Sequence, residues 1–501
     1  MVLSELARNL GGRTSGSSDP RIGRVTLDSR AVAPGDLFAA LPGVRAHGLD
    51  FADGARAAGA AALLVEASDE ARAAGVGLPL WVHDDAAEAL GRAAAELVGS
   101  PSRAMPTIAI TGTNGKTTVA WMAAELLRLA GRRPALLGTV GYHVEGAATE
   151  VASHTTPDAP RLQTLLARHR DAGGDAVVLE ASSHALEQRR LAGLDLDVAV
   201  FTNLTRDHLD YHGTLDAYRA AKARLFHALS DGGVAVLPAE GETADEFARI
   251  AVSRGARVIR YGTASSLGRH GSRVDLQATR PEVTPDGLSF SISGMGITDR
   301  STPLSLSGLH NVENLLAATA AVLSTGADPA ALQSGFASIS LPPGRLERVG
   351  PEGLGYRCLV DYAHTPDALR ATLSSLREEV DVTEGARLIC VFGCGGDRDR
   401  GKRPEMGATV TGLADLAIVT SDNPRTEDPH SIIDDVLTGC RGGRAEVQVE
   451  ADRRRAIRSA LESARNGDIV LIAGKGHEDY QILPTGRIHF DDREVVRELI
   501  G

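Results

Sequence analysis

No stretch of this sequence approaches the roughly 20 consecutive apolar residues that a bilayer-spanning helix requires. The first residues also lack the basic segment and the following apolar segment that mark a secretory signal. Cysteine is scarce, with 4 in 501 residues, so a disulfide scaffold is excluded, and the spacing of Cys390 and Cys394 does not suit zinc. We therefore expect a cytoplasmic protein without membrane insertion.

The chain also lacks the basic excess of a nucleic-acid-binding surface. Lysine and arginine number 53 and aspartate and glutamate 65, so the formal net charge is −12 and we expect no nucleic-acid partner. Hydrophobic residues make up 43% and charged residues 24%, which is typical of globular proteins and excludes a mainly disordered chain. A chain of this length predicts about three domains.

Two proline-containing segments interrupt the hydrophobic pattern, at residues 99–106 and near residues 341–344. They divide the chain into predicted domains at residues 1–103, 104–340 and 341–501. In the second and third domains, apolar strands alternate with helical spacing. This alternation predicts an α/β fold with parallel sheets that helices cover on both faces.

The same pattern predicts individual elements. In the first domain we predict strands at residues 25–27 and 36–40 and Ala-rich helices at residues 55–62 and 86–97. Buried strands of the other domains are predicted at residues 107–111, 176–180, 198–202, 234–237, 358–361, 388–392, 416–420 and 469–473.

The strongest local motif is Gly112-Thr113-Asn114-Gly115-Lys116-Thr117-Thr118, which follows a predicted strand and opens a predicted helix. Backbone N–H groups of such a loop cradle phosphate, the lysine neutralises its charge, and the Thr117 hydroxyl suits Mg²⁺. Position 110 is isoleucine instead of the glycine of the strict P-loop pattern, so the motif is a variant. A turn that only caps the helix is the alternative, but the strand–loop–helix context favours nucleotide binding.

Polar residues follow two more predicted strands. Glu180 ends one strand, and His208 lies in the segment after another. Ligands of doubly wound sheets bind outside the carboxyl ends of the strands, so both side chains are expected near Lys116. A carboxylate and an imidazole suit a divalent ion that holds phosphate oxygens. The alternative is that Asp207 and His208 only cap the following turn.

Lys222 lies in a predicted helix at residues 215–229, whose apolar side carries Tyr218, Leu225 and Phe226. Composition alone favours a solvated lysine at this position. The spacing indicates no other role.

Four polar loops marked by glycine or proline follow the predicted strands of the last domain. They contain Arg398 and Arg425 as well as Asp422 and Glu478. Guanidinium and carboxylate groups together suit a zwitterionic ligand such as an amino acid, whose carboxylate an arginine can bind in a forked pair. Helix capping would explain any one loop, but all of them together favour a binding site.

These motifs resemble those of the Mur ligase family, and the resemblance covers nearly the whole chain. It rests on residues 28–30, 34–38, 111–118, 203–210, 308–314 and 343–347. Residues 361–366 and 474–478 narrow it to the ligase that adds the third peptide residue. Asp422-Asn423-Pro424-Arg425 resembles the variant associated with meso-diaminopimelate.

The resemblance implies an ATP-dependent amide-bond ligase of cytoplasmic peptidoglycan precursor synthesis, which serves cell wall biogenesis, cell shape and cell division. It would add meso-2,6-diaminopimelate to the D-Glu γ-carboxylate of UDP-MurNAc-L-Ala-D-Glu through an acyl phosphate, forming ADP and phosphate. It also implies a small N-terminal α/β UDP-binding domain, a central P-loop ATPase domain with a parallel sheet, and a C-terminal Rossmann-like α/β domain that binds the amino acid. We expect a monomer.

The resemblance also implies roles for individual residues. ATP contacts are expected at Gly112, Thr113, Asn114, Gly115, Lys116, Thr117, Thr118, Asn311 and Arg345. Contacts to the UDP-MurNAc-dipeptide are expected at Leu27, Ser29, Val44, Arg45, Ala46, Thr155, Thr156, Ser182, Gln188 and Arg190. Contacts to diaminopimelate are expected at Arg398, Asp422, Asn423, Pro424, Arg425, Gly474 and Glu478.

The implied catalytic residues are Lys116, Glu180, His208 and Lys222. Lys222 matches a lysine that is carbamylated by CO₂ in the family. The resulting carboxylate would bind Mg²⁺ together with Thr117, Glu180 and His208. The resemblance thus replaces the interpretation of Lys222 as a solvated lysine.

Other functions are compatible with parts of the pattern. The same ligase could add L-lysine or another diamino acid. A folylpolyglutamate synthase would share the middle and C-terminal architecture but would leave residues 28–30 and 422–425 unexplained. A P-loop ATPase would hydrolyse ATP without an amine acceptor, and a non-catalytic nucleotide-binding protein would bind ATP without turnover.

Overall fold

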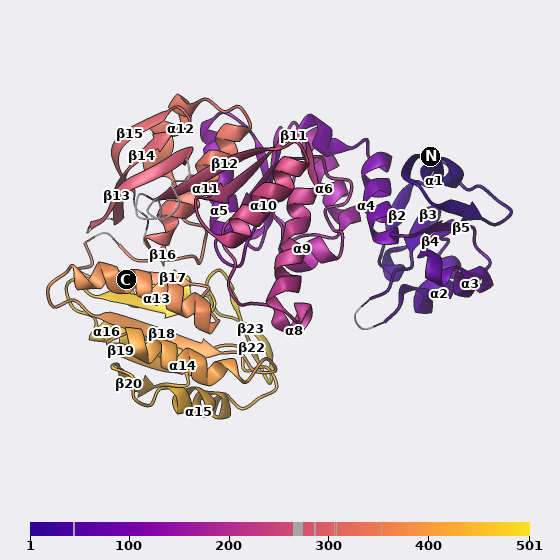
Figure 1. Ribbon diagram of the computed structural model, residues 1–501. Helices are drawn as coiled ribbons and strands as arrows, with labels where there is room; N and C mark the ends of the chain where they lie inside the picture. Colours follow the sequence, from indigo (N-terminus) through magenta and orange to yellow (C-terminus); the bar gives the residue numbers. More distant parts are fainter. Residues whose placement is uncertain (44–45, 264–273, 285–286, 305, 307, 352) are drawn as a thin grey trace. The chain divides into compact units, whose positions relative to one another are not determined.

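The computed structural model describes residues 1–43, 46–263, 274–284, 287–304, 306, 308–351 and 353–501. They form two compact units, Met1–Leu276 with Ala317–Leu332 and Gln277–Leu316 with Gln333–Gly501. Helices alternate with mainly parallel strands in both units, so the predicted α/β fold is confirmed (Figure 1). The domain boundaries placed after residues 103 and 340 stay a prediction.

The start of the first unit contains a five-stranded sheet in the order β1-β5-β4-β3-β2. Its strands are β1 (Arg13–Ser15), β2 (Arg24–Thr26), β3 (Asp36–Ala39), β4 (Ala62–Glu66) and β5 (Leu80–His83). Its helices are α1 (Leu3–Leu10), α2 (Ala52–Ala57), α3 (Glu70–Ala73) and α4 (Ala86–Leu97). Strands β2 to β5 pair in parallel, and β1 runs antiparallel to β5. The elements predicted at residues 25–27, 36–40 and 86–97 agree with β2, β3 and α4 to within one residue.

The helix predicted at residues 55–62 is wrong over its second half. Helix α2 ends at Ala57, Gly59 has a left-handed φ of +98°, and Ala62 begins strand β4. Residues 62–65 are fully buried between β3 and β5. The high helix propensity of alanine is therefore overridden by packing within the sheet.

The second sheet of this unit has its strands in the order β12-β11-β10-β6-β9-β7-β8. The strands are β6 (Thr107–Thr111), β7 (Pro134–Gly138), β8 (Gly141–His143), β9 (Ala176–Glu180), β10 (Leu196–Phe201), β11 (Leu229–Pro238) and β12 (Arg257–Thr263). The helices are α5 (Lys116–Leu129), α6 (Ala159–Asp171), α7 (Ser183–Glu187), α8 (Leu209–His212), α9 (Leu215–His227) and α10 (Glu242–Ser253). Neighbouring strands run parallel except β7 and β8, so β6, β9 and β10 end at one edge.

Continuous apolar strands form the core of this sheet, as the sequence predicts. Ile108 and Ile110 of β6 and Val177 and Val178 of β9 are fully buried. Burying a side chain of this size stabilises a fold by about 1.5–3 kcal/mol. The strand that leads into the loop at residues 112–115 is thus held rigidly on both sides by β10 and β9.

The second unit contains a six-stranded sheet in the order β16-β17-β21-β18-β19-β20. The strands are β16 (Glu347–Arg348), β17 (Arg357–Asp361), β18 (Leu388–Cys394), β19 (Leu416–Ser421), β20 (Glu446–Val449) and β21 (Ile469–Ala473). The helices are α13 (Pro366–Asp381), α14 (Lys402–Leu413), α15 (Pro429–Gly439), α16 (Arg453–Ser463) and α17 (Asp492–Ile500). Only β16 runs antiparallel to its neighbour in this described sheet. Helices α13 to α15 pack on one face, and α16 and α17 pack on the other.

The remaining elements complete the chain. They are β13 (Leu276–Thr284), β14 (Gly287–Gly294), β15 (Ile297–Leu304), α11 (His310–Ser324), α12 (Pro329–Gly335) and the hairpin β22 (Tyr480–Leu483) and β23 (Gly486–His489). Within the described ranges, no helix combines the length and the apolar character needed to cross a bilayer.

Candidate active site

Residues 112–115 form the loop between β6 and α5, as predicted. A Cβ added to Gly112 would lie 1.8 Å from the Thr202 hydroxyl oxygen, so only glycine fits there. Asn203 holds the loop, because its side-chain oxygen accepts a hydrogen bond from the Asn114 N–H at 3.0 Å. The first turn of α5 then presents backbone N–H groups without intrahelical partners, an arrangement that suits phosphate.

Two lysines meet at the carbonyl group of Gly112. The Lys116 Nζ donates hydrogen bonds to the carbonyl oxygens of Gly112 and Thr113, each at 2.8 Å. The Lys222 Nζ donates to the Gly112 carbonyl oxygen, also at 2.8 Å. Lysine side chains beside a Gly-rich loop suit an anion.

Lys222 is buried, with 1% of its surface exposed, so the interpretation of a solvated lysine is wrong. On α9 it shares one face with Tyr218, Leu225 and Phe226, and that face packs in the core. Burial, and to a smaller extent the charge of Lys116, lowers the pKa of Lys222 well below its usual value. A buried amine with a lowered pKa has the neutral form that reacts with CO₂.

Glu180 and Thr117 are brought together at the carboxyl ends of β9 and β6. The Glu180 Oε2 accepts hydrogen bonds from the Thr117 hydroxyl at 2.9 Å and from the Thr139 hydroxyl at 3.2 Å. The other oxygen, Oε1, accepts from the Thr139 N–H at 2.7 Å. Sequence reasoning missed Thr139, although its place directly after an apolar run that forms β7 could have indicated it.

His208 lies at the same edge but does not bond to the other predicted metal ligands. Its ring packs against the rings of His184 and Tyr218, with centroids 4.9 and 6.2 Å away. Its side chain makes no capping hydrogen bond to α8, so capping does not explain it. Among the described residues, no three His, Cys, Asp or Glu side chains are grouped closely enough to hold a metal. The predicted set has only two such residues and depends on Thr117 and a modified Lys222.

The residues predicted to contact the dipeptide form one hydrogen-bonded network. The Arg190 Nη1 donates to the Thr156 carbonyl oxygen at 2.7 Å, and its Nη2 donates to the Gln188 Oε1 at 2.8 Å. The Thr156 hydroxyl lies 3.3 Å from the Ser182 hydroxyl. It also donates to the Glu180 carbonyl oxygen at 2.7 Å, which connects the network to strand β9.

Thr155 joins this network through another route, because its hydroxyl lies 3.3 Å from that of Thr139. Burial lowers the pKa of Arg190, a sign that its guanidinium is drawn away from bulk water. The structure thus brings all five predicted dipeptide-binding residues of this region to the edge where β9 ends.

The predicted uridine-binding residues lie in the first sheet region. Leu27 follows β2 and is 39% exposed, and Ser29 begins a short 3-10 turn at Ser29–Ala31. Ala46 is exposed. Val44 and Arg45 lie outside the described residues.

Two further residues predicted to contact ATP lie in the second unit. Asn311 is buried at the start of α11, and its Oδ1 accepts a hydrogen bond from the Asn314 side chain at 2.8 Å. The Arg345 guanidinium stacks over the Tyr362 ring at 4.8 Å from its centroid.

Lys475 is the centre of the predicted diaminopimelate site, although sequence reasoning gave it no role. It is fully buried, and its Nζ lies 3.2 Å from the Asp422 Oδ1. The same Nζ donates to the Asn423 Oδ1 at 3.1 Å and to the Tyr480 carbonyl oxygen at 2.7 Å. The Asn423 amide donates in turn to the Glu478 Oε2 at 3.1 Å. The loops after β19 and β21 therefore meet around one buried ammonium group.

The two carboxyl groups of this site have pKa values shifted in opposite directions. Burial by itself raises the pKa of Asp422, but the charges of Lys475 and Arg453 outweigh it and hold this pKa below its usual value. Burial, assisted by the charge of Asp422, raises the pKa of Glu478. Asp422 is thus the more firmly ionised of the two and supplies a permanent negative charge.

Arg398 lies in the loop after β18, and Arg425, from the loop after β19, lies against it. A Cβ added to Gly395 would lie 2.9 Å from the Arg425 Nη1 and 3.9 Å from the Arg398 Cγ. The Arg425 Nη1 donates to the Gly396 carbonyl oxygen at 2.7 Å. Both predicted arginines are therefore brought to one loop, together with the buried Pro424.

Gly474 completes this set of predicted residues. It has a φ of +120°, and a Cβ added to it would lie 3.8 Å from the Asp422 Oδ2.

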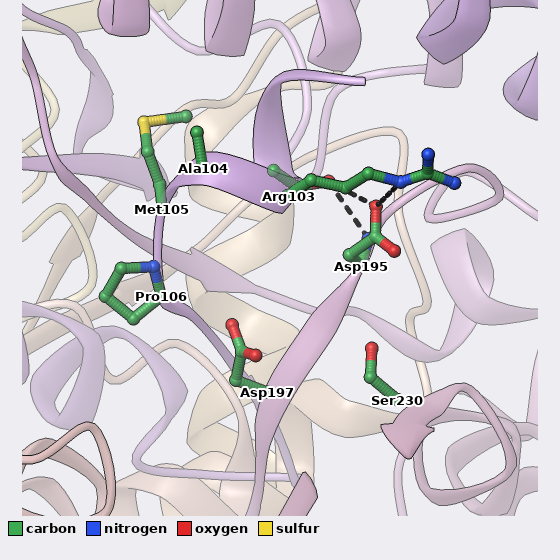
Figure 2. A pocket seen from close by; sticks show the side chains of 8 residues that line it. Arg103, Ala104, Met105, Pro106, Asp195, Asp197 and Ser230 are labelled. Carbon is green, nitrogen blue, oxygen red and sulfur yellow. Dashed lines mark hydrogen bonds and ion pairs between the residues drawn. The ribbon is translucent and has the colours of Figure 1, made fainter. Parts of the chain in front are cut away.

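An open cavity lies elsewhere in the described chain. It has a volume of about 490 Å³ and is lined by residues 102–106, Asp195, Asp197 and Ser230 (Figure 2). These residues stand at the amino ends of β6, β10 and β11, whereas the loop at residues 112–115 follows the carboxyl end of β6. The cavity is therefore not part of the candidate active site.

Three family models match the chain. The Mur ligase middle domain matches residues 110–322, and the Mur ligase glutamate ligase domain matches residues 344–476. The catalytic domain of the Mur ligase family matches residues 21–97.

Individual relatives agree with these matches. The UDP-N-acetylmuramoyl-L-alanyl-D-glutamate--2,6-diaminopimelate ligase of Syntrophomonas wolfei is 40% identical and covers 100% of this chain and 99% of its own length. A solved structure of a ligase with this name is 37% identical, with a TM-score of 0.71 over 100% of this chain and 99% of that one. A folylpolyglutamate synthase from Mycobacterium tuberculosis shares the fold over 77% of this chain and 91% of its own, with a TM-score of 0.59 and 24% identity. The chain belongs to the Mur ligase family.

Proposed function

We propose that this protein is the ATP-dependent ligase that adds meso-2,6-diaminopimelate to the D-Glu γ-carboxylate of UDP-MurNAc-L-Ala-D-Glu. The observation that carries this proposal is the 40% identity, over the full length of both chains, to a relative that bears the name of this activity. The reaction consumes ATP and releases ADP and phosphate, and it belongs to peptidoglycan precursor synthesis.

The loop at residues 112–118 binds the phosphates of ATP. Lys116 is the cation that compensates charge on the transferring phosphoryl group, and the N–H groups of the loop and of α5 surround it. Two hydrogen bonds now tie Lys116 to the carbonyl oxygens of its own loop. An incoming phosphate is a stronger partner, because its hydrogen bonds with an ammonium group are charge-assisted. Asn311 and Arg345 also contact ATP.

Thr117, Glu180, His208 and the carbamate of Lys222 would hold Mg²⁺. Two observations support this donor set: Thr117 and Glu180 already share a hydrogen bond of 2.9 Å, and Lys222 is buried beside Lys116. Conversion of Lys222 to a carbamate would replace a buried amine by a hard oxygen ligand. When bound, the metal ion neutralises charge on the phosphoryl oxygens.

The reaction has two steps. First, the γ-carboxylate of D-Glu attacks the γ-phosphorus of ATP, and the bond from that phosphorus to the ADP oxygen breaks. A carboxylate has no adequate leaving group, and the acyl phosphate formed here supplies one. The amine of diaminopimelate then attacks the acyl carbon, loses a proton, and releases phosphate from the tetrahedral intermediate. Arg190 and Thr156 hold the dipeptide so that its carboxylate faces Lys116.

Arg425 is the residue that selects the amino acid. Meso-diaminopimelate differs from L-lysine by one additional carboxylate, and a guanidinium group binds a carboxylate in a forked pair. When lysine enters, the same guanidinium loses water without gaining a partner, which weakens binding. Arg398, Asp422, Asn423, Pro424, Gly474 and Glu478 complete the pocket.

Leu27, Ser29 and residues 44–46 hold the uridine part of the substrate. The domains span residues 1–103, 104–340 and 341–501. The protein acts as a monomer in the cytoplasm, with no nucleic-acid or membrane partner.

Phosphate release with ATP, Mg²⁺ and UDP-MurNAc-L-Ala-D-Glu tests the proposed function. We expect strong turnover with meso-diaminopimelate, little with L-lysine and almost none without an amine. Equal turnover with lysine would keep the ligase and contradict the selector role of Arg425. Release without any amine would contradict the ligase and indicate a hydrolase.

Arg425→Ala is expected to lower kcat/KM for meso-diaminopimelate by roughly 10–100-fold, the loss typical of a charge-assisted hydrogen-bonding partner. The KM for ATP should change little, since Arg425 belongs to the amino-acid pocket. Steady-state kinetics with each substrate varied in turn measures both values. Arg441→Ala, which removes an exposed arginine of the same unit, is the matched control and should behave as wild type. Unchanged diaminopimelate kinetics in Arg425→Ala would rule out the selector role.

A further inference from the structure

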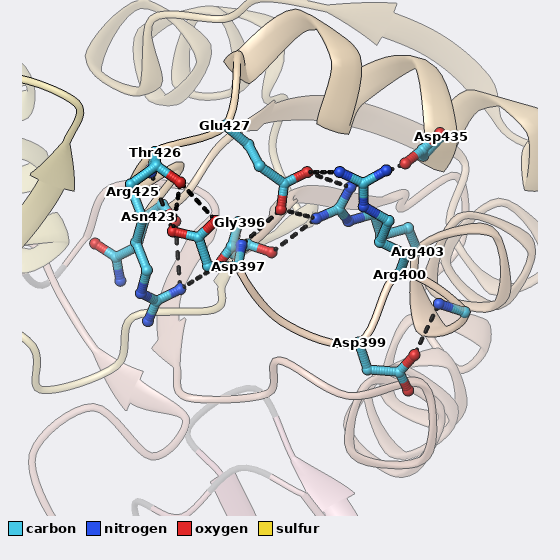
Figure 3. A network of polar contacts seen from close by, with 12 residues as sticks. Gly396, Asp397, Asp399, Arg400, Arg403, Asn423, Arg425, Thr426, Glu427 and Asp435 are labelled. Carbon is cyan, nitrogen blue, oxygen red and sulfur yellow. Dashed lines mark hydrogen bonds and ion pairs between the residues drawn. The ribbon is translucent and has the colours of Figure 1, made fainter.

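The two loops that carry Arg398 and Arg425 are joined by hydrogen bonds outside the predicted site. The Asp397 N–H donates to the Glu427 Oε1 at 2.6 Å. The Thr426 hydroxyl donates to the Asp397 Oδ1 at 2.7 Å, and the Thr426 N–H donates to the Asp397 Oδ2 at 3.1 Å (Figure 3). The loop after β18 and the loop after β19 are therefore joined at the two residues that directly follow Arg425.

A buried guanidinium group anchors this connection. Arg403 of α14 is fully buried, and its Nη2 donates to the Glu427 Oε1 at 2.8 Å while its Nη1 donates to the Glu427 Oε2 at 3.1 Å. The Arg403 Nη1 also donates to the Asp435 carboxylate at 2.9 Å. A buried charge of this kind persists only with such partners. Arg403 thus fixes the position of the Glu427 carboxylate. This carboxylate in turn accepts the hydrogen bond from the Asp397 N–H.

The Glu427 carboxylate stays ionised near neutral pH. Its hydrogen bonds with Arg403 and Asp397 therefore do not depend on pH in that range. The hydrogen bonds from Arg403 lower the pKa of Glu427 to about 2. Arg400 adds a further hydrogen bond to the Glu427 Oε2 at 2.9 Å.

The backbone at both ends of the connection is in an unfavourable conformation. Asp397 and Arg425 have left-handed φ values of +52° and +55°, which non-glycine residues rarely adopt. Aspartate tolerates this region, but a long side chain such as arginine is held there only by its surroundings. The Arg425 N–H is fixed by the Ile482 carbonyl oxygen at 3.0 Å, and the next N–H, that of Thr426, is fixed by Asp397.

The direction of the Arg425 side chain depends on the same loop. Its Nη1 donates to the carbonyl oxygen of Gly396, the residue directly before Asp397. Within the described chain, no hydrogen-bond acceptor is recorded for the Arg425 Nε or Nη2. These two groups are the ones that can form a forked pair with a carboxylate.

We propose that Asp397, Arg403, Thr426 and Glu427, which we name the loop bridge, position the Arg425 guanidinium and so set the preference for an amino acid with a second carboxylate. This inference rests on the proposed function. The four residues are positioning residues, because they act through Arg425. Their removal lets the Arg425 backbone leave the left-handed region and turns its free N–H groups away from the pocket.

The test uses the full-length enzyme with ATP, Mg²⁺ and UDP-MurNAc-L-Ala-D-Glu. Asp397→Asn keeps a residue that tolerates the left-handed backbone but replaces one carboxylate oxygen by an NH₂ group, which cannot accept a hydrogen bond from Thr426. We expect KM for meso-diaminopimelate to rise roughly tenfold, and the preference over L-lysine to fall by a similar factor. The kcat and the KM for ATP should stay within about twofold of wild type.

Thr426 offers a matched pair of milder substitutions, since it is exposed and either change is compatible with folding. Thr426→Val removes the hydroxyl donor at nearly constant volume, and we expect KM for meso-diaminopimelate to rise about threefold. Thr426→Ser keeps the hydroxyl and should behave as wild type.

The outcomes separate the two proposals. A wild-type enzyme without amine-dependent phosphate release would overturn the proposed function and the loop bridge with it. A wild-type enzyme that selects diaminopimelate, combined with unchanged KM and preference in Asp397→Asn and Thr426→Val, would overturn the loop bridge alone. An equal rise in KM for ATP and for meso-diaminopimelate would also overturn it, because it would indicate a general structural role.

Discussion

Lys222→Ala is expected to abolish ligation, with a loss of at least about 100-fold in kcat. The variant removes the group that becomes the carbamate, and α9 has no other side chain placed to replace that oxygen ligand. Short carboxylates such as acetate or formate should restore part of the activity, because the substitution leaves space beside Gly112 that the Lys222 Nζ occupies in the structure. Phosphate release measured with and without added carboxylate checks both effects.

Arg224→Ala is the control for the lysine variant. Arg224 lies two residues further along α9, where its guanidinium is partly exposed and pairs with Glu187 at 3.2 Å. It points away from the buried face that carries Lys222, so its removal should leave activity unchanged and insensitive to carboxylates. Full activity of Lys222→Ala without any carboxylate would disprove the carbamate.

Lys116→Ala should eliminate turnover as well, by a factor of roughly 100–1,000 or more. Charge that develops on the transferring phosphoryl group then lacks the Lys116 cation. The Thr113 carbonyl oxygen loses the Lys116 donor, whereas the Gly112 carbonyl oxygen keeps its hydrogen bond from Lys222. Lys116→Arg should not restore activity, because a planar guanidinium does not fit where a compact ammonium group points into a tight loop.

Phosphate and ADP release, together with ATP binding by titration calorimetry, measures this effect. Arg128→Ala removes an exposed cation near the other end of α5 and should leave all three quantities unchanged. Ligation by Lys116→Ala near the wild-type rate would refute the role of Lys116 in phosphate binding.

The strand–loop–helix at residues 107–129 could be predicted from local sequence, because a short β-branched run, two glycines and a helical pattern each act over a few residues. The C-terminal loops around Asp422 and Glu478 could be predicted for the same reason, since each follows an apolar strand. The helix predicted at residues 55–62 was wrong because the burial of residues 62–65 depends on strands β3 and β5. Local alanine content carries no information about those neighbours.

The burial of Lys222 could not be predicted from composition. A lysine in a helix is usually solvated, and only the packing of α9 buries this one to 1% exposure. Family resemblance indicated a special role, but the contact of its ammonium group with the carbonyl of residue 112 is a property of the tertiary structure.

The sequence by itself determined the α/β class, the phosphate-binding loop, the polar strand ends and the membership of a ligase family, because each depends on short patterns of residues. The tertiary structure decided which side chains meet: Thr139 with Glu180, Lys475 with Asp422, and Arg403 with Glu427. These partners are separated by 41, 53 and 24 positions, as their residue numbers give, and no local pattern relates them. They meet because the order of strands in each sheet, set by burial of whole apolar faces, brings distant loops to one edge.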